Sequence, residues 1–371
     1  MNWHWNLILI FTFISVGCTQ CLAQSKNVES IKINSQTSVQ VTSPWRLIEI
    51  DSDASLRGLH VFSEKEIFAS GTSGTIVSSI DGGQNWKVRQ IEGAEQLDFR
   101  DIHALDDATL IAMSSGTPAC IYRSTNGGLS WKQVFKSDDP KVFLDCMSFW
   151  DSQNGVIMGD PINGVLFLLT TSDGGRNWKQ VLKAPATIAG EAGFAASGSN
   201  MITKDGTLMI ALGSAEPKKS FQTSRILFSS DRLGTWKSAK VPMPRDPSSG
   251  IFSIHFVDNK NGIAVGGNYQ QPDSTLGNYA ITRDGGMTWR VPKKGVPPTG
   301  YRSCVAHFMK GREITLVAVG PNGTDISGDL GDSWRRVSNH GFHSVEFSPD
   351  GRSGWATGSD GRIAKWLGKG K

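Results

Sequence analysis

Three arginines are the residues of this 371-residue sequence best suited to bind a ligand. Arg57, Arg100 and Arg302 each stand near the start of a short apolar run, at equivalent positions of repeated units. A guanidinium group forms paired hydrogen bonds with a carboxylate or a phosphate. Three such groups at one level would bind an anionic group, such as a peptide carboxylate or an acidic sugar.

Other polar side chains are expected on the same face. His343 takes the arginine position in the last unit, and the irregular fourth unit offers Glu191. Loops of that face add Arg225 and Tyr269, together with Asp160 and Asp325. The predicted ligand-binding residues are therefore Arg57, Arg100, Glu191, Arg225, Tyr269, Arg302 and His343.

An alternative interpretation needs no ligand. Each arginine would pair with a nearby acid, such as Asp101, Asp145 or Glu191, and would only fill the mouth of a channel. Buried arginine–acid networks can be structural, so the sequence leaves both interpretations open.

The units that carry these residues are marked by a recurring turn. Residues 79–86 read Ser-Ile-Asp-Gly-Gly-Gln-Asn-Trp, and five variants follow, with tryptophans at positions 86, 131, 178, 236, 289 and 334. Repeats of this length are typical of supersecondary units that stack or surround an axis. The turn residues and tryptophans are Asp81, Trp86, Asn126, Trp131, Asp173, Trp178, Asp231, Trp236, Asp284, Trp289, Asp329 and Trp334.

The turn is expected to be structural rather than catalytic. An aspartate can accept hydrogen bonds from nearby backbone N–H groups, and the glycines permit positive φ. The tryptophan would pack between neighbouring sheets. Asn126 replaces the aspartate in the second copy, so the position does not require a charge. Equivalent turns on an outer rim also cannot converge on one pocket, as a catalytic site must.

Each unit is predicted to hold four short strands, for example over residues 56–62, 66–71, 75–80 and 86–91. The seventh unit begins at Phe342 and has only three strands. Residues 45–50 match the strand that follows each repeated tryptophan, so they would supply its fourth. The predicted fold is all-β, a seven-bladed β-propeller with 3+1 closure of the last blade by an N-terminal strand. Closure removes unpaired sheet edges.

The N-terminus has the composition of a targeting segment. The apolar run at residues 7–16 is too short to span a bilayer, which favours a cleaved secretory signal. The predicted organisation is a signal peptide at 1–23, a flexible leader at 24–43 and the propeller at 44–371. Lipidation at Cys18 is the alternative to cleavage. The protein is expected to be exported, in the periplasm or outside the cell, with no transmembrane segment.

Composition argues against several other classes. The 38 Lys and Arg residues are scattered among 34 acids, which gives no basic face for nucleic acid. The cysteines have no zinc-ligand spacing, and the fold position alone can explain recurring histidines at 60, 103, 255 and 307. No dinucleotide-binding glycine motif opens a helix, so an oxidoreductase has little support. We expect no cofactor and no metal, and a monomer.

The pattern Ser/Thr-x-Asp-x-Gly-x-x-Trp resembles the Asp-box, or BNR repeat, of sialidases, sortilin-type receptors and photosystem II assembly factors. The order Leu56-Arg57-Gly58-Leu59, then Gly71 to Gly74, then Ser79 to Trp86 is most similar to the photosystem II stability/assembly factor-like propellers, including their exported bacterial members. This resemblance implies a non-catalytic propeller that binds a protein partner and assists assembly or stability of an envelope complex.

A sialidase-like glycoside hydrolase or glycan-binding protein is the alternative. A sialidase needs three arginines and a tyrosine nucleophile with a glutamate partner, which Tyr269 or Tyr301 and Glu191 could supply. However, the Arg-Ile-Pro pattern of sialidases is missing, and those enzymes have six blades. A hydrogen bond between tyrosine and glutamate beside the arginines would distinguish the two functions.

Overall fold

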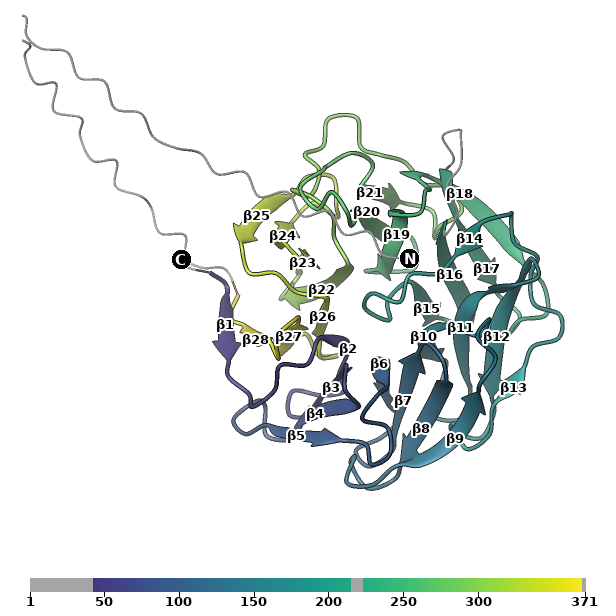
Figure 1. Cartoon of the computed structure of the whole chain (residues 1–371). Coiled ribbons are helices and arrows are strands. Elements are labelled where there is room, and N and C mark those ends of the chain that lie inside the picture. Colours follow the sequence, from purple (N-terminus) through teal and green to yellow (C-terminus); the bar gives the residue numbers. More distant parts are fainter. Residues whose placement is uncertain (1–42, 215–222, 369–371) are drawn as a thin grey trace, which may run out of the picture. The chain divides into compact units, whose positions relative to one another are not determined.

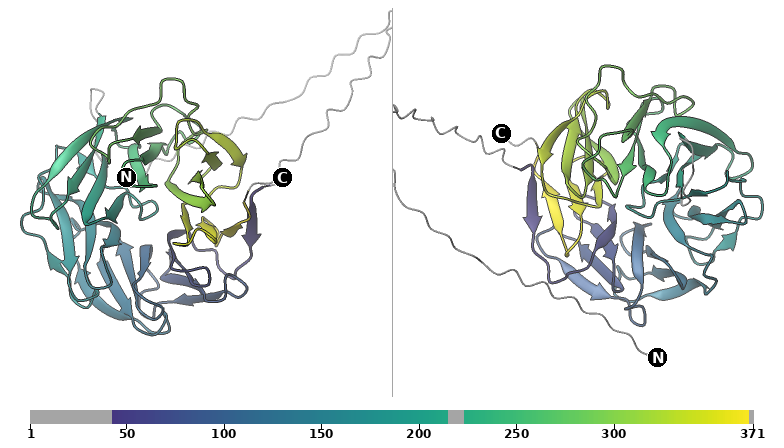
Figure 2. Two further views of the ribbon diagram at one scale, coloured as in Figure 1. Left: turned by 180° about the vertical axis from the view of Figure 1, so that it is seen from behind. Right: turned by 45° about the horizontal axis from the view of Figure 1, so that its top comes forward.

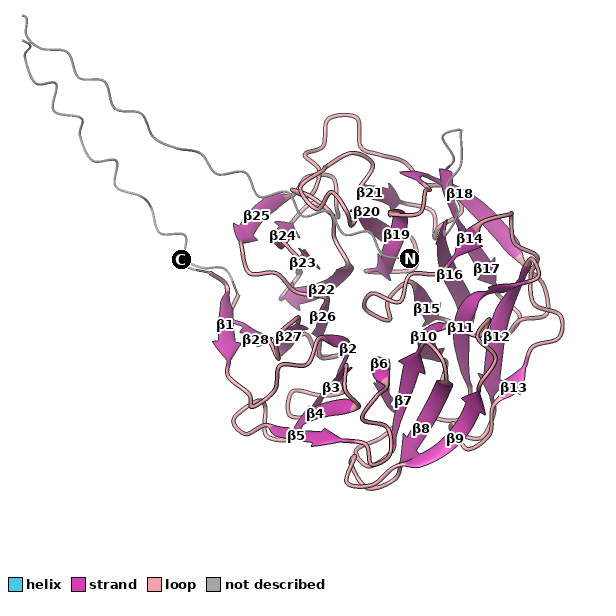
Figure 3. Cartoon of the chain, in the orientation of Figure 1, coloured by secondary structure: helices cyan, strands magenta, loops and turns pink. Residues whose placement is uncertain are grey.

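The structure, a computed structural model, describes residues 43–214 and 223–368 as seven β-sheets arranged around one axis (Figures 1 and 2). All regular elements of this part are strands, and none of it is helical (Figure 3). Accordingly, the described part contains no helix able to span a membrane. The predicted signal peptide, Cys18 and the leader up to residue 42 lie outside the described residues. The seven-bladed all-β prediction is confirmed.

Blades 1 to 3 follow the predicted four-strand plan, in which strands adjacent in sequence pair antiparallel. Blade 1 comprises β2 (Leu56–Val61), β3 (Ile67–Gly71), β4 (Thr75–Ser79) and β5 (Lys87–Gln90). Blade 2 comprises β6 (Asp98–Ala104), β7 (Leu110–Ser115), β8 (Ala119–Ser124) and β9 (Lys132–Ser137). Blade 3 comprises β10 (Leu144–Phe149), β11 (Gly155–Ile162), β12 (Val165–Thr171) and β13 (Lys179–Gln180).

Blades 4 and 5 depart from this plan. Blade 4 comprises β14 (Glu191–Ala192), β15 (Met201–Lys204), β16 (Thr207–Ser214), β17 (Thr223–Ser229) and β18 (Lys237–Pro244). Both β14 and β15 pair with β16, so the innermost strand is interrupted over residues 193–200. Blade 5 comprises β19 (Ser249–Phe256), β20 (Gly262–Asn268) and β21 (Tyr279–Thr282). An isolated bridge between Ile281 and Arg290 replaces its outer strand.

The last two blades close the ring. Blade 6 comprises β22 (Cys304–Lys310), β23 (Glu313–Gly320), β24 (Gly323–Ser327) and β25 (Arg335–Ser338). Blade 7 comprises β26 (Ser344–Phe347), β27 (Gly354–Thr357), β28 (Ile363–Trp366) and β1 (Trp45–Ile48). The β1 strand pairs antiparallel with β28, from Trp45 opposite Trp366 to Ile48 opposite Ile363 (Figure 1). The 3+1 closure is confirmed.

The apolar core lies between neighbouring blades rather than at the axis. Phe68 of blade 1 packs with Phe99 and Leu110 of blade 2, and equivalent clusters fill the other blade interfaces. Trp355 is fully buried between blades 7 and 1. Its ring occupies the space beside Gly83, where a Cβ atom would lie 2.0 Å from the ring. The second glycine of the turn is therefore required by packing as well as by its positive φ.

The recurring turn is held together by its own side chains. Asp81 Oδ1 accepts hydrogen bonds from the Ser79 hydroxyl and from the Asn85 backbone N–H, each at 2.9 Å. The Gly83 N–H donates to Ser79 Oγ at 2.9 Å. Asn126 accepts the equivalent N–H bond, from Ser130, at 2.9 Å. A neutral amide thus takes the place of the carboxylate, which supports the structural interpretation.

These turns predict a loss of stability in acid. Hydrogen bonds from the Asn85 backbone and side chain lower the pKa of Asp81 to about 2, and those from the side chain and backbone of Thr235 lower that of Asp231 to about 2. Because the folded state holds these protons less tightly than the unfolded chain does, the stabilisation is complete above about pH 4 and is lost as pH falls to about 2. Urea unfolding between pH 5 and pH 2 should show this decline. An Asp81→Asn, Asp231→Asn variant should show a shallower decline, and an unchanged slope would contradict the assignment.

Candidate functional site

A set of β-bulges positions the candidate ligand-binding residues. The innermost strands of blades 1, 2, 3 and 5 each carry one extra residue at the same level. A bulge re-aims the side chain of the extra residue and is common next to binding sites. The four extra residues are Arg57, Arg100, Asp145 and Phe252. In blade 3 the residue at this level is Asp145, between Leu144 and Cys146.

These four residues line one pocket of about 380 Å³ at the axis, which we call the arginine pocket. Its apolar wall contains the stacked rings of Phe194 and Phe252, 4.0 Å apart between centroids. The Tyr301 ring meets Phe252 edge-on at 4.7 Å. The pocket is further lined by Phe143, Asp160, Gly193, Ala195, Ala196, Tyr269, Ser303, Pro321 and His343.

Arg57 is the residue of the arginine pocket whose guanidinium group is available to bind a ligand. Its side chain is half-buried, and among the described residues its guanidinium makes no hydrogen bond or ion pair. Burial lowers its pKa, and the nearby positive charge of Arg100 lowers it further. Arginine nevertheless stays protonated in proteins. The Asp98 carboxylate, which is bound to Arg100, acts in the opposite direction on the pKa of Arg57. The fold therefore presents to this pocket a partly desolvated cation that forms no direct ion pair, as an anion-binding site requires.

Arg100 is only partly committed to the protein. Its Nε donates to Asp98 Oδ2 at 2.7 Å, and its Nη1 donates to the Ala195 carbonyl at 3.2 Å. The guanidinium also lies 5.9 Å from the centre of the Phe143 ring. Its side chain is 29% exposed. The remaining N–H groups are available to share an anion with Arg57.

Two acids of the arginine pocket carry less charge than their type suggests. Burial raises the pKa of Asp160 to about 6, although the Gly193 N–H donates to its Oδ1 at 3.0 Å. Burial, reinforced by Asp160, raises the pKa of Asp145 well above its usual value. Asp145 Oδ2 is buried without a hydrogen-bond partner in the described structure. Asp145 therefore carries less negative charge than an exposed aspartate does, whereas Asp160 loses its charge only when the pH falls below about 6.

Arg302 is not part of the arginine pocket, which corrects our expectation of a three-arginine column. Its side chain is fully buried and its Nε donates to Asp325 Oδ2 at 2.7 Å. Further bonds go to Asn322, Thr299 and the Tyr301 carbonyl. The alternative interpretation, an arginine paired with an acid, is the one that applies to Arg302.

Glu191 and Arg225 also lie outside the arginine pocket and bind each other. Arg225 Nε donates to Glu191 Oε1 at 2.6 Å and Nη2 donates to Oε2 at 2.7 Å. Arg245 lies 3.2 Å from the same carboxylate, and the Ile188 N–H donates to it at 2.8 Å. Glu191 is buried. This network anchors β14 and uses both oxygens of the Glu191 carboxylate.

Tyr269 and His343 do line the arginine pocket. Tyr269 is 46% exposed at its rim. Burial lowers the pKa of His343 to about 3, so the ring is neutral at physiological pH. Its Nε2 lies 3.1 Å from the hydroxyls of Ser55 and Ser359. The Glu191 carboxylate is already bound by Arg225 and by the Ile188 N–H. Neither Tyr269 nor Tyr301 forms a hydrogen bond with it in the described structure, so the tyrosine–glutamate pair of the sialidase alternative is not formed there.

The floor of the arginine pocket was not predicted from the sequence. Residues 193–200, between β14 and β15, project toward the axis near β15 (Figure 1). Ser197 donates to the Ser303 carbonyl of blade 6 at 2.9 Å, and Ser199 donates to Ser253 of blade 5 at 2.8 Å. The available signal was the long fourth repeat, whose small residues at 195–199 can pass through a narrow channel.

Part of the chain is similar in sequence to photosystem II assembly factors. A family model described as photosynthesis system II assembly factor YCF48 matches residues 37–141, which include blades 1 and 2. The photosystem II assembly lipoprotein Ycf48 of Synechococcus sp. (strain CC9902) is 24% identical over 174 residues, 47% of each chain. Its counterpart in Prochlorococcus marinus (strain NATL2A) is 30% identical over 95 residues, 26% of this chain and 24% of that protein. The chain thus spans about half, or less, of the curated relatives that it matches.

The fold is also found in a solved structure of YCF48 bound to D1 peptide. The match has a TM-score of 0.58 at 17% identity and covers 90% of this chain and 100% of that chain. At this identity the likeness shows the fold alone. Together, the repeats, the blade order and the partial family match show that the chain is a β-propeller that resembles the photosystem II assembly factors.

Proposed function

We propose that the arginine pocket binds an anionic group, most simply a carboxylate, of a protein partner, and that the chain acts without catalysis as an assembly or stability factor for an envelope complex. The observation that carries this proposal is the guanidinium of Arg57, which makes no hydrogen bond or ion pair with the described residues and lines an aromatic pocket. A carboxylate would bind to Arg57 and to the free N–H groups of Arg100.

The walls of the pocket favour a ligand with an apolar body beside its charge. Phe194, Phe252 and Tyr301 form one continuous aromatic cluster. Aromatic side chains bury large apolar areas and are common anchors in protein interfaces. A peptide segment with an acidic group and a neighbouring apolar side chain satisfies both halves of the pocket.

The comparisons support a protein partner and an envelope location. The similar YCF48 structure holds a D1 peptide, and both matched relatives are named lipoproteins. We infer that this chain is exported through its N-terminal segment and is released after cleavage at residue 23 or anchored by lipid at Cys18.

Affinity capture from the native envelope tests this function. A tagged parent protein and an Arg57→Gln variant are compared, with Arg312→Gln, an exposed arginine outside the pocket, as the matched control. We expect one set of partner proteins with the parent and the control, and its loss with Arg57→Gln. Equal capture by all three, or hydrolysis of a sialoside that requires Arg57, would overturn the proposal.

The proposed site should bind anions more tightly as the pH falls. Asp160, with a pKa of about 6, is ionised at pH 8 and mostly protonated at pH 5.5. Its negative charge opposes a bound carboxylate, so the affinity for 3-phenylpropionate should rise several-fold over this range. Calorimetric titration measures this change. An Asp160→Asn variant, which can still accept the Gly193 N–H bond, should bind with little pH dependence, and an unaltered pH profile would contradict the role of Asp160.

A further inference from the structure

The axial channel holds a second pocket, of about 390 Å³, beyond residues 193–200. Residues 193–196 line the arginine pocket, whereas residues 197–199 line the second one, and the two pockets share no lining residue. The interrupted inner strand of blade 4 therefore divides the channel into two separate chambers. The side chains that line the second chamber therefore determine which ligand it can bind.

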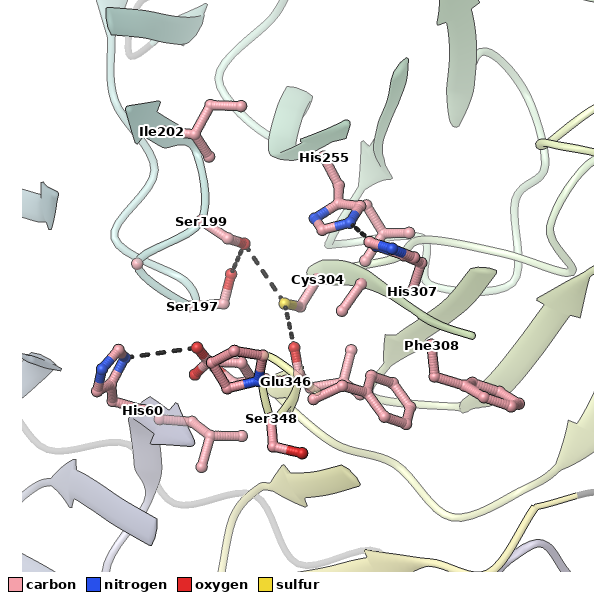
Figure 4. A pocket seen from close by; sticks show the side chains of 18 of the residues that line it. His60, Ser197, Ser199, Ile202, His255, Cys304, His307, Phe308, Glu346 and Ser348 are labelled. Carbon is pink, nitrogen blue, oxygen red and sulfur yellow. Dashed lines mark hydrogen bonds and ion pairs between the residues drawn. The ribbon is translucent and has the colours of Figure 1, made fainter. Parts of the chain in front are cut away.

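Four histidines from blades 1, 2, 5 and 6 line this chamber, which we call the histidine pocket: His60, His103, His255 and His307. His255 Nε2 and His307 Nδ1 share a hydrogen bond at 2.6 Å (Figure 4). The His60 and His103 rings pack with their centroids 4.2 Å apart. In the described part of the chain, no three histidine, cysteine or acidic side chains are arranged to hold a metal ion.

The histidine pocket is rich in hydrogen-bond acceptors. Its lining includes Asp101, Glu346 and Asp350, and none of its lining residues is a lysine or an arginine. Burial lowers the pKa of His103, His255 and His307, with smaller contributions from His60, His307 and Lys204. These imidazoles are therefore neutral at physiological pH and can accept as well as donate hydrogen bonds.

One position in the pocket already attracts a positive charge. His60 Nδ1 lies 3.4 Å from Glu346 Oε1, and the other carboxylate oxygen accepts the Val61 N–H at 3.0 Å (Figure 4). Burial acts to lower the pKa of His60, but the Glu346 carboxylate, with help from Asp101, more than offsets this and raises it. The Glu346 side chain is 33% exposed, so a ligand can reach it.

The rest of the lining suits an aliphatic stem. Ile202, Phe308 and Val345 contribute apolar surface to the same pocket as Glu346. An amphipathic cation buries its stem along such surface and places its charged end beside an acid. We propose that the histidine pocket binds an ammonium or guanidinium group on an aliphatic stem, as in a lysine or arginine side chain or a free diamine, with Glu346 as its counter-ion. This site has the opposite charge preference to the arginine pocket and does not depend on it.

Binding of such a cation should displace the proton that His60 shares with Glu346. The charged and titratable groups that face His60 are Glu346, Asp101 and His103. Burial raises the pKa of Asp101 to about 7, so its deprotonation also strengthens cation binding as the pH rises. The affinity should therefore increase from pH 6 to pH 8, with net release of protons.

Calorimetric titrations with three probes test the proposal: 1,5-diaminopentane, Nα-acetyl-lysine methylamide and its uncharged norleucine analogue. Phosphate and MOPS buffers, whose ionisation enthalpies differ, report proton release. We expect one or both cations to bind and the norleucine analogue to bind at least tenfold more weakly. Binding of the diamine indicates a free amine as the source, and binding of the lysine derivative alone indicates a peptide. Failure of both cations to bind, or equal binding of the norleucine analogue, would overturn the proposal.

Variants locate the site. Glu346→Gln keeps an oxygen for the Val61 N–H and should weaken cation binding at least tenfold, whereas Glu92→Gln, at an exposed acid outside the pocket, should bind as the parent does. Ile202→Trp should block the pocket without removing a charge. Arg57→Gln should leave cation binding unchanged, so that failure here and failure of the arginine pocket can be told apart. Parent-like affinity in Glu346→Gln and Ile202→Trp would exclude the histidine pocket.

Discussion

Replacement of Arg302 by methionine should lower the free energy of unfolding by about 3–5 kcal/mol. Arg302 and Asp325 form an ion pair in which both side chains are fully buried. Removal of the guanidinium would leave the Asp325 carboxylate desolvated and without its counter-ion. Urea unfolding of the parent and the variant measures the difference.

A double variant separates the ion pair from general damage to packing. Asp325→Asn in the Arg302→Met background removes the stranded charge but keeps an acceptor for the Thr299 N–H, which donates to Asp325 at 2.8 Å. We expect the double variant to recover a substantial part of the lost stability. Below the unfolding transition, the single variant should bind 3-phenylpropionate within about twofold of the parent, since Arg302 does not line the arginine pocket. Parent-like stability of Arg302→Met would contradict the structural assignment.

Arg57→Gln should have the opposite profile, with weakened binding and unimpaired stability. Hydrogen bonds to a charged partner contribute about 1.5–3 kcal/mol, so the affinity for 3-phenylpropionate should fall roughly 10- to 150-fold. Stability should stay the same or rise slightly, because burial and the nearby charge of Arg100 disfavour the charged guanidinium more than the attraction of Asp98 favours it. Calorimetry and urea unfolding of the same preparation measure both quantities.

The control for Arg57→Gln is Arg312→Gln, which removes the same charge from the chain but lies outside the pocket. It should bind the probe as the parent does. If both variants lose affinity equally, long-range charge would explain the effect better than a specific site. If Arg57→Gln unfolds much more easily than the parent, Arg57 has a structural role like that of Arg302.

The different environments of Arg57 and Arg302 could not be predicted from the sequence. Both arginines occupy the same position in their repeats, and the alignment could not distinguish them. The partner of Arg302 is Asp325, 23 residues further along the chain. Which side of an inner strand an arginine faces depends on where the bulge falls and on a distant loop, and neither is visible in a local pattern.

The fold itself was predictable because it depends on repetition. The tryptophans and the glycine turns mark each blade, and the match of Trp45 to the repeated strand predicted its pairing with β28. The interrupted inner strand of blade 4 was not predictable. Residues 193–200 are held by bonds from Ser197 and Ser199 to two other blades, and these contacts have no period in the sequence.

The interrupted inner strand of blade 4 also gives a possible function to the four histidines of the histidine pocket. In the sequence they appear to be a by-product of a repeated fold position, and two of them do pair with each other. In the structure, residues 197–199 close a chamber around them that also holds Glu346. A repeated position became a candidate site only because blade 4 departs from the repeat.

The most direct test of the central claim is a titration of the Arg57 side chain itself. Its Nε–Hε signal in a ¹⁵N-labelled protein can be assigned by its loss in Arg57→Gln. We predict a saturable shift of this signal with 3-phenylpropionate, larger at pH 5.5 than at pH 8, and no shift with the matched neutral amide, 3-phenylpropionamide. An unmoved signal, or an equal shift with the amide, would contradict anion binding by the arginine pocket.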